Sequence, residues 1–334
     1  MTKQIIKTAH TLGSDISANE RSKPADFSSY IAPLSPKDKL LIKATVLKFR
    51  PKSISYEDSW GYIIQASRYN GFRWYDPETG YLIFFCNKSE KDPTLVIPNY
   101  FAKPEYLAKV IAIVQELKKS PKVILKNISH SDAKALIHAG FRYYRKDEVW
   151  SGFAKYDDQT FPQLVIDLDK LAEARGRDYR NLRTALNKSE DYIFRKYRRT
   201  DLKKVLEIFA LRDGNTLDSP SAKHGMYYAS HAIYPPSNIA KYVVEDKVTK
   251  KILGFLASSD ISGENTALVA SVFIPGIKIA SIWGMYQALM FKRSQGFRQI
   301  NIGGFETPGT YNFLRLTFRP VAQLKRLHLV YNPK

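Results

Sequence analysis

Cysteine is almost absent from this chain, because Cys86 is the single one in 334 residues. One cysteine excludes an internal disulfide, and its place in the apolar run YLIFFC predicts a buried strand residue. The six histidines show no spacing typical of a metal site, so no bound metal is expected. These scarcities favour a reducing compartment, of which the cytoplasm is the simplest.

Long hydrophobic runs are also scarce. The first residues, MTKQIIKTAHTLGSD, contain no apolar core of signal-peptide length, so export is not expected. Only the range 268–291 is long and apolar enough to resemble a membrane span. Pro275 and Gly276 interrupt it, which predicts a strand, a turn and a separate helix. We therefore expect no transmembrane segment.

Acidic residues are too few to balance the basic ones. The chain has 52 Lys and Arg against 32 Asp and Glu, a net charge of +20. Such a surplus favours polyanionic partners, namely tRNA or another nucleic acid, an anionic lipid surface in peripheral contact, or a phosphorylated small ligand. The alternative is a basic surface that binds none of them.

Positive charge gathers between Ala174 and Arg199, where nine Lys or Arg stand against three acids. Arg177, Arg180 and Arg183 recur at every third residue, while apolar residues recur at spacings of three and four. This pattern predicts a helix with one cationic and one apolar face. The three arginines are candidates for binding phosphates of a donor or of tRNA; the alternative is an interdomain connector with a solvated face.

The length of the chain exceeds what one hydrophobic core usually holds, so two domains are predicted. Strand, strand, strand, helix, strand, helix, strand is the order of patterns in both halves, with RLHLVY as the final strand of the second. The predicted fold class is α/β, as two tandem units, each a mixed and mostly antiparallel sheet with flanking helices. The expected bounds are an N-terminal arm at 1–34, a first domain at 35–160, and a second at 161–334 that begins with a basic connector helix near 170–190.

Three segments carry a resemblance to a known family: VIDLDKLAEARGRDYRNLRTALNK from Val165, INIGGFETPG from Ile300, and FLRLTFRPVAQLKRLHLVY from Phe313. With them, the chain from Ser35 to Tyr331 resembles two copies of the Gcn5-related N-acetyltransferase fold. It is similar to the Fem-type aminoacyltransferases and, more closely, to the cytosolic C-terminal domain of phosphatidylglycerol lysyltransferases and its soluble relatives.

The resemblance implies a transferase. It implies movement of an acyl or aminoacyl group from acyl-CoA or aminoacyl-tRNA to an amine or hydroxyl acceptor, without a firmly predicted cofactor. Acetyltransferases of this fold hold the pyrophosphate of coenzyme A where the fourth strand meets the next helix. That junction is PGIKIAS here, so Lys278 and Ser281 are the candidate donor-binding residues.

A second candidate cluster follows the strand INIGG. Gly303 and Gly304 permit close approach of a donor to the backbone, and Glu306 is the candidate general base for the acceptor. Arg315 stands where the resemblance places a lysine, and a cation there stabilises an oxyanion or a donor phosphate. Alternatively, Glu306 caps the next helix or pairs with Arg315.

The rival to an enzyme is a non-catalytic module that binds nucleic acid or an anionic surface on the same fold. Fold alone does not decide between the two.

Overall fold

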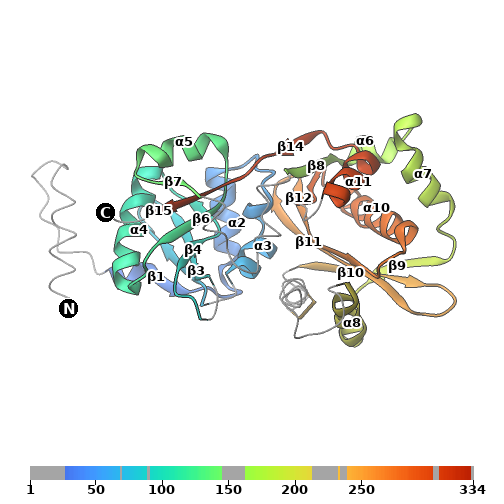
Figure 1. The fold of residues 1–334 in the computed structure, drawn as a ribbon, viewed down its shortest axis with the longest axis horizontal. Helices are drawn as coiled ribbons and strands as arrows, with labels where there is room; N and C mark the ends of the chain where they lie inside the picture. Colours follow the sequence, from blue (N-terminus) through green and yellow to red (C-terminus); the bar gives the residue numbers. More distant parts are fainter. Residues whose placement is uncertain are drawn as a thin grey trace, which may run out of the picture.

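The computed structural model describes residues 27–67, 70–88, 91–144, 162–212, 232–233, 239–303 and 308–331. Two lobes lie side by side along the long axis of the molecule (Figure 1). We name residues 27–144 together with the last strand the first lobe, and residues 162–324 the second lobe.

The first lobe is built mainly from short strands and four α-helices. Its elements are η1 (Phe27–Tyr30), β1 (Ile31–Pro33), α2 (Asp38–Phe49), η2 (Tyr56–Asp58), α3 (Trp60–Ala66), β2 (Phe72–Tyr75), β3 (Leu82–Asn87), β4 (Leu95–Ile97), β5 (Tyr100–Phe101), α4 (Pro104–Lys118), β6 (Val123–Ile128), α5 (His130–His138) and β7 (Arg142–Tyr143). Local sequence explains α4 well: Pro104 occupies its first turn, and Leu107, Val110, Ile111 and Val114 form the buried face.

The second lobe repeats this kind of organisation with longer strands. Its elements are β8 (Gln163–Asp167), α6 (Leu168–Glu173), η5 (Arg177–Tyr179), α7 (Arg180–Asn187), β9 (Tyr192–Lys196), η6 (Arg199–Asp201), α8 (Leu202–Arg212), β10 (Ala240–Asp246), β11 (Ile252–Ser262), β12 (Asn265–Phe273), α10 (Lys278–Ser294), β13 (Gln299–Asn301), α11 (Pro308–Phe318) and β14 (Ala322–Leu324). The final strand is β15 (Leu327–Tyr331).

Each lobe contains one mixed sheet. The first has the order β1-β2-β3-β4-β6-β15-β7 with β5 also paired to β3, and the second has the order β14-β8-β13-β12-β11-β10-β9. Among the described strands most neighbours are antiparallel, and one pair in each sheet is parallel, namely β4 with β6 and β12 with β13. The predicted fold class, two tandem mixed α/β units with mostly antiparallel sheets and flanking helices, is confirmed.

The two sheets exchange their penultimate strands. β15 leaves the second lobe and pairs with β6 and β7 of the first sheet. β8, which follows the first lobe in sequence, occupies the matching place in the second sheet, between β13 and β14. Figure 1 shows β15 running from the second lobe into the first. The expectation that RLHLVY completes the second unit is therefore wrong.

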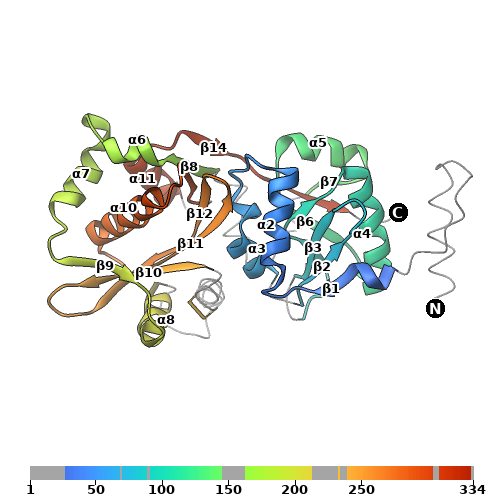
Figure 2. The same ribbon diagram turned by 180° about the vertical axis from the view of Figure 1, so that it is seen from behind.

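One of the three large hydrophobic cores is shared by both lobes. It joins Ile42, Trp60 and Phe84 of the first lobe to Phe255 and Val269 of the second, all of them buried. α2 and α3 lie at the junction of the lobes (Figure 2). At Gly61 the close packing of α3 on β11 leaves no room for a side chain, because a Cβ there would lie 2.9 Å from Cβ of Ser259. The other two cores lie within the lobes.

Two further expectations are corrected by the elements themselves. The basic segment is not one continuous helix, because Ala174 and Gly176 have positive φ angles of 27° and 82° and separate α6 from η5 and α7. Part of the expected N-terminal arm, residues 27–33, forms η1 and β1, and β1 is the edge strand of the first sheet.

The apolar range 268–291 folds as predicted, into β12, a turn and α10. Within the described residues, no helix combines the length and apolar character needed to cross a membrane.

Candidate functional site

Both parallel strand pairs separate after three paired residues, and each opens into a fork. We define the first fork as the space beyond Ile97 of β4 and Leu125 of β6, and the second fork as the space beyond Ala267 of β12 and Asn301 of β13. Separated strands leave backbone groups unpaired, and such groups must be satisfied by side chains or by a ligand.

The segment between α2 and α3, residues 50–59, reaches both forks. In the first fork, the Arg50 guanidinium donates to the carbonyl of Tyr100 at 3.0 Å and to Oδ1 of Asp58 at 2.8 Å. It also lies 4.9 Å from the ring of Phe101. Burial lowers the pKa of Arg50, but the charge of Asp58 and the hydrogen bond to it act in the opposite direction and the pKa is raised overall, so the side chain stays cationic.

The first fork opens into a cavity of about 300 Å³. We name it the fork cavity. Its wall comes from both lobes and consists of Arg50, Lys52, Ser53, Ile54, Ser55, Glu57, Asp58, Pro98, Asn99, Tyr100, Lys126, Asn127, Ile128, Ser129, Asp132, Leu324 and Arg326. Four cations face three carboxylates in this wall, which leaves one net positive charge before any ligand binds.

Three polar atoms of this wall are buried without a hydrogen-bond partner of ordinary geometry among the described residues. They are the hydroxyl of Tyr100, Oδ1 of Asn127 and Nε of Arg326. Nε of Arg326 lies 3.5 Å from Glu57 and the hydroxyl of Tyr100 interacts with Asp132, whereas Oδ1 of Asn127 has no such neighbour. Incompletely satisfied buried groups are rare in folded proteins, which indicates that a ligand or ordered water completes them. The fork cavity therefore offers donors and an acceptor to a bound molecule.

The two buried acids of the wall are already committed to protein partners. Asp58 accepts from Arg50 and from Asn99 at 2.9 Å on one oxygen, and from Ser53 at 2.5 Å on the other. Glu57 accepts from Gln163 on one oxygen and from Ser55 at 2.6 Å on the other. They fix the wall and are not placed to take up a substrate proton.

Glu57 also belongs to a polar chain that ties the lobes together. The amide of Gln163 on β8 bridges Glu57 and Asn301, whose side-chain nitrogen lies 2.9 Å from Oε1 of Gln163 and 2.8 Å from the carbonyl of Ile54. Arg326 approaches Glu57 at 3.5 Å. Buried networks of this kind hold one geometry, because every lost partner leaves a costly unsatisfied group.

Asp132, in the first turn of α5, is the remaining carboxylate of the wall. It shares this wall with Tyr100, and burial, followed by the charge of Asp132, raises the pKa of Tyr100 above its ordinary value. Tyr100 consequently stays protonated at neutral pH and acts as a donor. A neutral phenol beside a carboxylate provides one group that gives a proton and one that takes it.

Tyr56, from the same segment 50–59, fills the second fork. Its hydroxyl donates to the carbonyl of Val269 at 3.1 Å. Val269 is the extra residue of a β-bulge, since Ala257 pairs with Ala270 and Ser258 with Leu268. The ring also covers Gly303, whose φ of 79° favours glycine and where an added Cβ would lie 3.4 Å from Tyr56.

Those residues predicted from sequence that the structure describes lie in the second lobe, and none of them lines the fork cavity. Arg177, Arg180 and Arg183 are exposed on η5 and α7, at the outer end of that lobe (Figure 1). Arg183 donates to the carbonyl of Gly176, so part of its charge is used within the segment.

Lys278 and Arg315 lie on neighbouring helices. Lys278 of α10 sits 4.9 Å from the ring of Phe313 on α11, two residues before Arg315. Nε of Arg315 is buried and has no hydrogen-bond partner among the described residues. Ser281 is half-buried one turn into α10.

Gly303 is buried against Tyr56, as described above. Gly304 and Glu306 lie outside the described residues. The sequence analysis missed the fork cavity, although the string YEDSW carried a signal: its acids adjoin large aromatic residues, and an acid that is buried with such neighbours must be paired or hydrogen-bonded.

No protein-family model and no curated protein matches the sequence. Several solved structures share its fold. A conserved protein of unknown function from Bacteroides thetaiotaomicron is 14% identical, with a TM-score of 0.64 over 90% of this chain and 99% of that one. L-PGS from Bacillus licheniformis is 14% identical, with a TM-score of 0.58 over 90% of this chain and 92% of that one.

FemX is 11% identical, with a TM-score of 0.59 over 91% of this chain and 97% of that one. The expected resemblance to lysyltransferase C-terminal domains and Fem-type proteins is therefore confirmed at the level of fold. Identities this low show a shared fold and do not show a shared reaction.

Proposed function

We propose that the protein is a transferase that moves an acyl or aminoacyl group onto an amine or hydroxyl acceptor, and that the fork cavity is where the groups meet. The observation that carries this proposal is one cavity between the lobes whose wall brings together a carboxylate, a phenol and a guanidinium, beside the buried Oδ1 of Asn127 that has no partner among the described residues. The shared fold with L-PGS and FemX supports the class of reaction.

The chemistry needs positioned groups and no covalent intermediate on the protein. The acceptor nitrogen or oxygen attacks the carbonyl carbon of the donor, and a new C–N or C–O bond replaces the ester or thioester bond. We assign Asp132 as the base that takes the acceptor proton, which ends on the leaving oxygen or sulfur. Tyr100 and Arg326 are placed to donate to the oxyanion.

The side chains that occupy the two forks, Arg50 and Tyr56, favour an ester donor such as aminoacyl-tRNA over acyl-CoA. An extended amide chain such as pantetheine binds well by adding to an unpaired strand edge. The edge carbonyls of Tyr100 and Val269 already accept from Arg50 and Tyr56. At these positions an extended amide chain would compete with the two side chains for the carbonyls.

An assay with two donors tests the proposal. Labelled aminoacyl-tRNA and labelled acetyl-CoA are offered separately with a panel of amines and alcohols, and label in the acceptor is measured. We expect transfer from aminoacyl-tRNA, and a loss of about 10²- to 10⁴-fold in turnover for Asp132→Asn, as for other positioned bases. No transfer from either donor contradicts the proposal.

A matched variant compares this site with the cluster predicted from sequence. If Glu306 is the base and Arg315 its cationic partner, then Glu306→Gln loses turnover and Asp132→Asn does not. That result moves the reaction to the second lobe. If both variants keep full turnover, neither residue is the base.

A second candidate function, a non-catalytic module that binds polyanions, is favoured by the exposure of Arg177, Arg180 and Arg183. Replacing all three by Gln is expected to weaken tRNA binding and flatten its salt dependence. The control replaces Lys103, Lys109 and Lys134, exposed on the first lobe, and loses the same charge. Equal binding by both triple variants contradicts a role for the arginines.

A further inference from the structure

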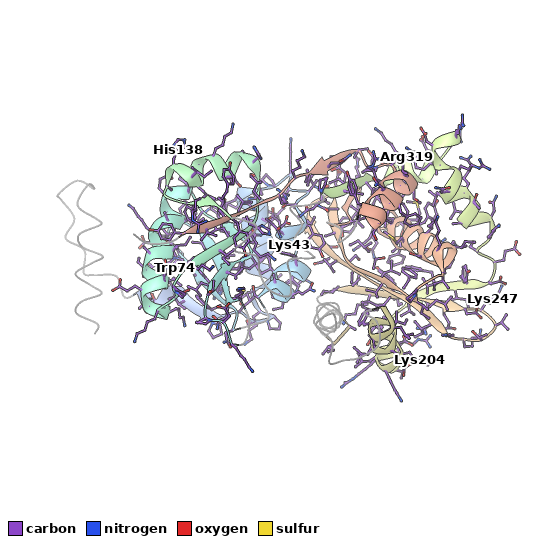
Figure 3. The ribbon with its side chains drawn as sticks, in the orientation of Figure 1. Lys43, Trp74, His138, Lys204, Lys247 and Arg319 are labelled. Atoms are coloured by element: carbon purple, nitrogen blue, oxygen red, sulfur yellow. The ribbon has the colours of Figure 1, made fainter. Side chains whose placement is uncertain are left out.

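A second cavity, of about 270 Å³, also lies at the junction of the lobes. We name it the lysine cavity. Its wall consists of Lys39, Ile42, Lys43, Asp58, Trp60, Ile239, Ala240, Ser258, Ser259, Asp260, Ile261, Lys292 and Gln295. Lys43 lies between the two lobes in Figure 3. Asp58 belongs to the walls of both cavities, so the segment around it separates them.

The charge of this wall is positive. Three lysines face two aspartates, and both aspartates have partners: Asp58 accepts from Arg50, and Asp260 accepts from Lys292 at 2.8 Å. Lys292 is only 3% exposed, and it lies 4.6 Å from the ring of Phe297. A buried ammonium held in this way keeps a fixed position, which suits recognition of an anion.

Trp60 adds a donor that has no acceptor. The residue is 3% exposed, and its Nε1 has no hydrogen-bond partner among the described residues. An indole N–H can only donate, so an atom that completes it must be an acceptor. Trp60 and the lysines together line this cavity with several donors, of which Lys292 donates to Asp260.

We propose that the lysine cavity binds a small molecule that carries a phosphate group. Ammonium groups are point charges that suit the dispersed charge of a phosphate dianion, and the indole N–H suits one of its oxygens. Ile42, Ile239 and Ile261 form an apolar part of the wall, which fits a small apolar body attached to the phosphate. The site is separate from the proposed transfer site and does not depend on it.

Indole NMR signals test the proposal directly. Inorganic phosphate and phenyl phosphate are titrated into the full chain, and the Trp60 Nε1–H signal, assigned with Trp60→Phe, is followed. We expect a saturable shift with both probes and tighter binding of phenyl phosphate. Trp74 is the internal control, because its Nε1 already donates to the hydroxyl of Tyr106 at 3.2 Å.

A surface variant keeps the test independent of folding. Lys43 is exposed, so Lys43→Gln should fold normally and weaken phosphate binding about ten-fold. Lys48→Gln on the same helix is the control, because that lysine donates to the carbonyl of Thr79 and does not line the cavity. Equal weakening by both variants overturns the assignment.

Other anions decide the specificity. Chloride or acetate that shifts Trp60 as much as phosphate does, at equal ionic strength, overturns the phosphate assignment. A response to anionic lipid vesicles alone, with none to either soluble probe, shows surface docking and overturns it as well. No movement of the Trp60 signal with any probe overturns the site itself.

Discussion

The two forks begin with the same topology and hold different contents. In both, a parallel pair of strands separates after three residues, and a side chain from the segment 50–59 takes an edge carbonyl. Arg50 leaves a cavity beside it in the first fork, whereas the ring of Tyr56 packs against Gly303 in the second. The same arrangement of strands therefore leaves a cavity in the first fork, whereas a core side chain fills the second.

The difference follows from side-chain shape and burial. Arg50 is held at the edge by Asp58 and Asn99, and its side chain stays 30% exposed. Tyr56 is 7% exposed and belongs to the core that both lobes share. A planar ring in that place excludes water and joins the first lobe to the second sheet.

Emptying the second fork should produce the largest effect. Tyr56→Ala removes a buried ring from the shared core, and we expect the free energy of unfolding to fall by about 3–5 kcal/mol. Urea denaturation measures it. Tyr56→Phe keeps the ring and removes the hydroxyl that donates to Val269, for a loss of about 1 kcal/mol. If the Ala variant loses no more than the Phe variant, the ring does not fill the fork.

Removing the cation of the first fork should have the next largest effect. Arg50→Met leaves the Asp58 carboxylate, fully buried, without its ion pair, and we expect a loss of about 3 kcal/mol in the same assay. Arg298→Met is the control: its pair with Glu264 is exposed on both sides, so the change should stay within about 0.5 kcal/mol. Similar losses in the free energy of unfolding for the two variants would show that the buried pair of Arg50 and Asp58 stabilises the protein no more than an exposed pair.

The pH dependence of stability should reveal the smallest difference. The raised pKa of Tyr100 means that the folded protein keeps the phenol proton at pH values where the unfolded chain releases it. The contribution of Tyr100 to the free energy of unfolding is therefore fully present below pH 10 and is lost as the pH rises above that value. Tyr100→Phe should reduce this fall by up to about 1 kcal/mol per pH unit. Identical slopes for wild type and variant, measured by urea denaturation from pH 9 to 11, would contradict the burial of the phenol.

Periodicity and turn residues were enough to predict the elements that carry strong local signals. The range 268–291 shows this, because Pro275 and Gly276 end β12 before α10 begins. The basic helix was predicted as continuous, since the repeat of arginines says nothing about the positive φ at Ala174 and Gly176.

Sheet membership and the fork cavity were beyond the sequence pattern. RLHLVY has the alternation of a strand, but the pattern does not name its partners, and β15 pairs with strands about 200 positions earlier in the chain. The cavity is formed by residues as distant as Arg50, Asp132 and Arg326. No local spacing relates them, so only the folded chain brings them together.

The exchange of β8 and β15 has a consequence for synthesis of the chain. The first sheet has a gap between β6 and β7 until residue 331 has been made, so the first lobe cannot finish folding as the earlier part emerges. Pairing over so great a sequence distance is intrinsically slow, because the loop entropy is lost before the contacts form. Until then, β6 and β7 lack the strand that separates them and keep unpaired backbone groups, which are the kind of strand edge that favours pairing with another chain.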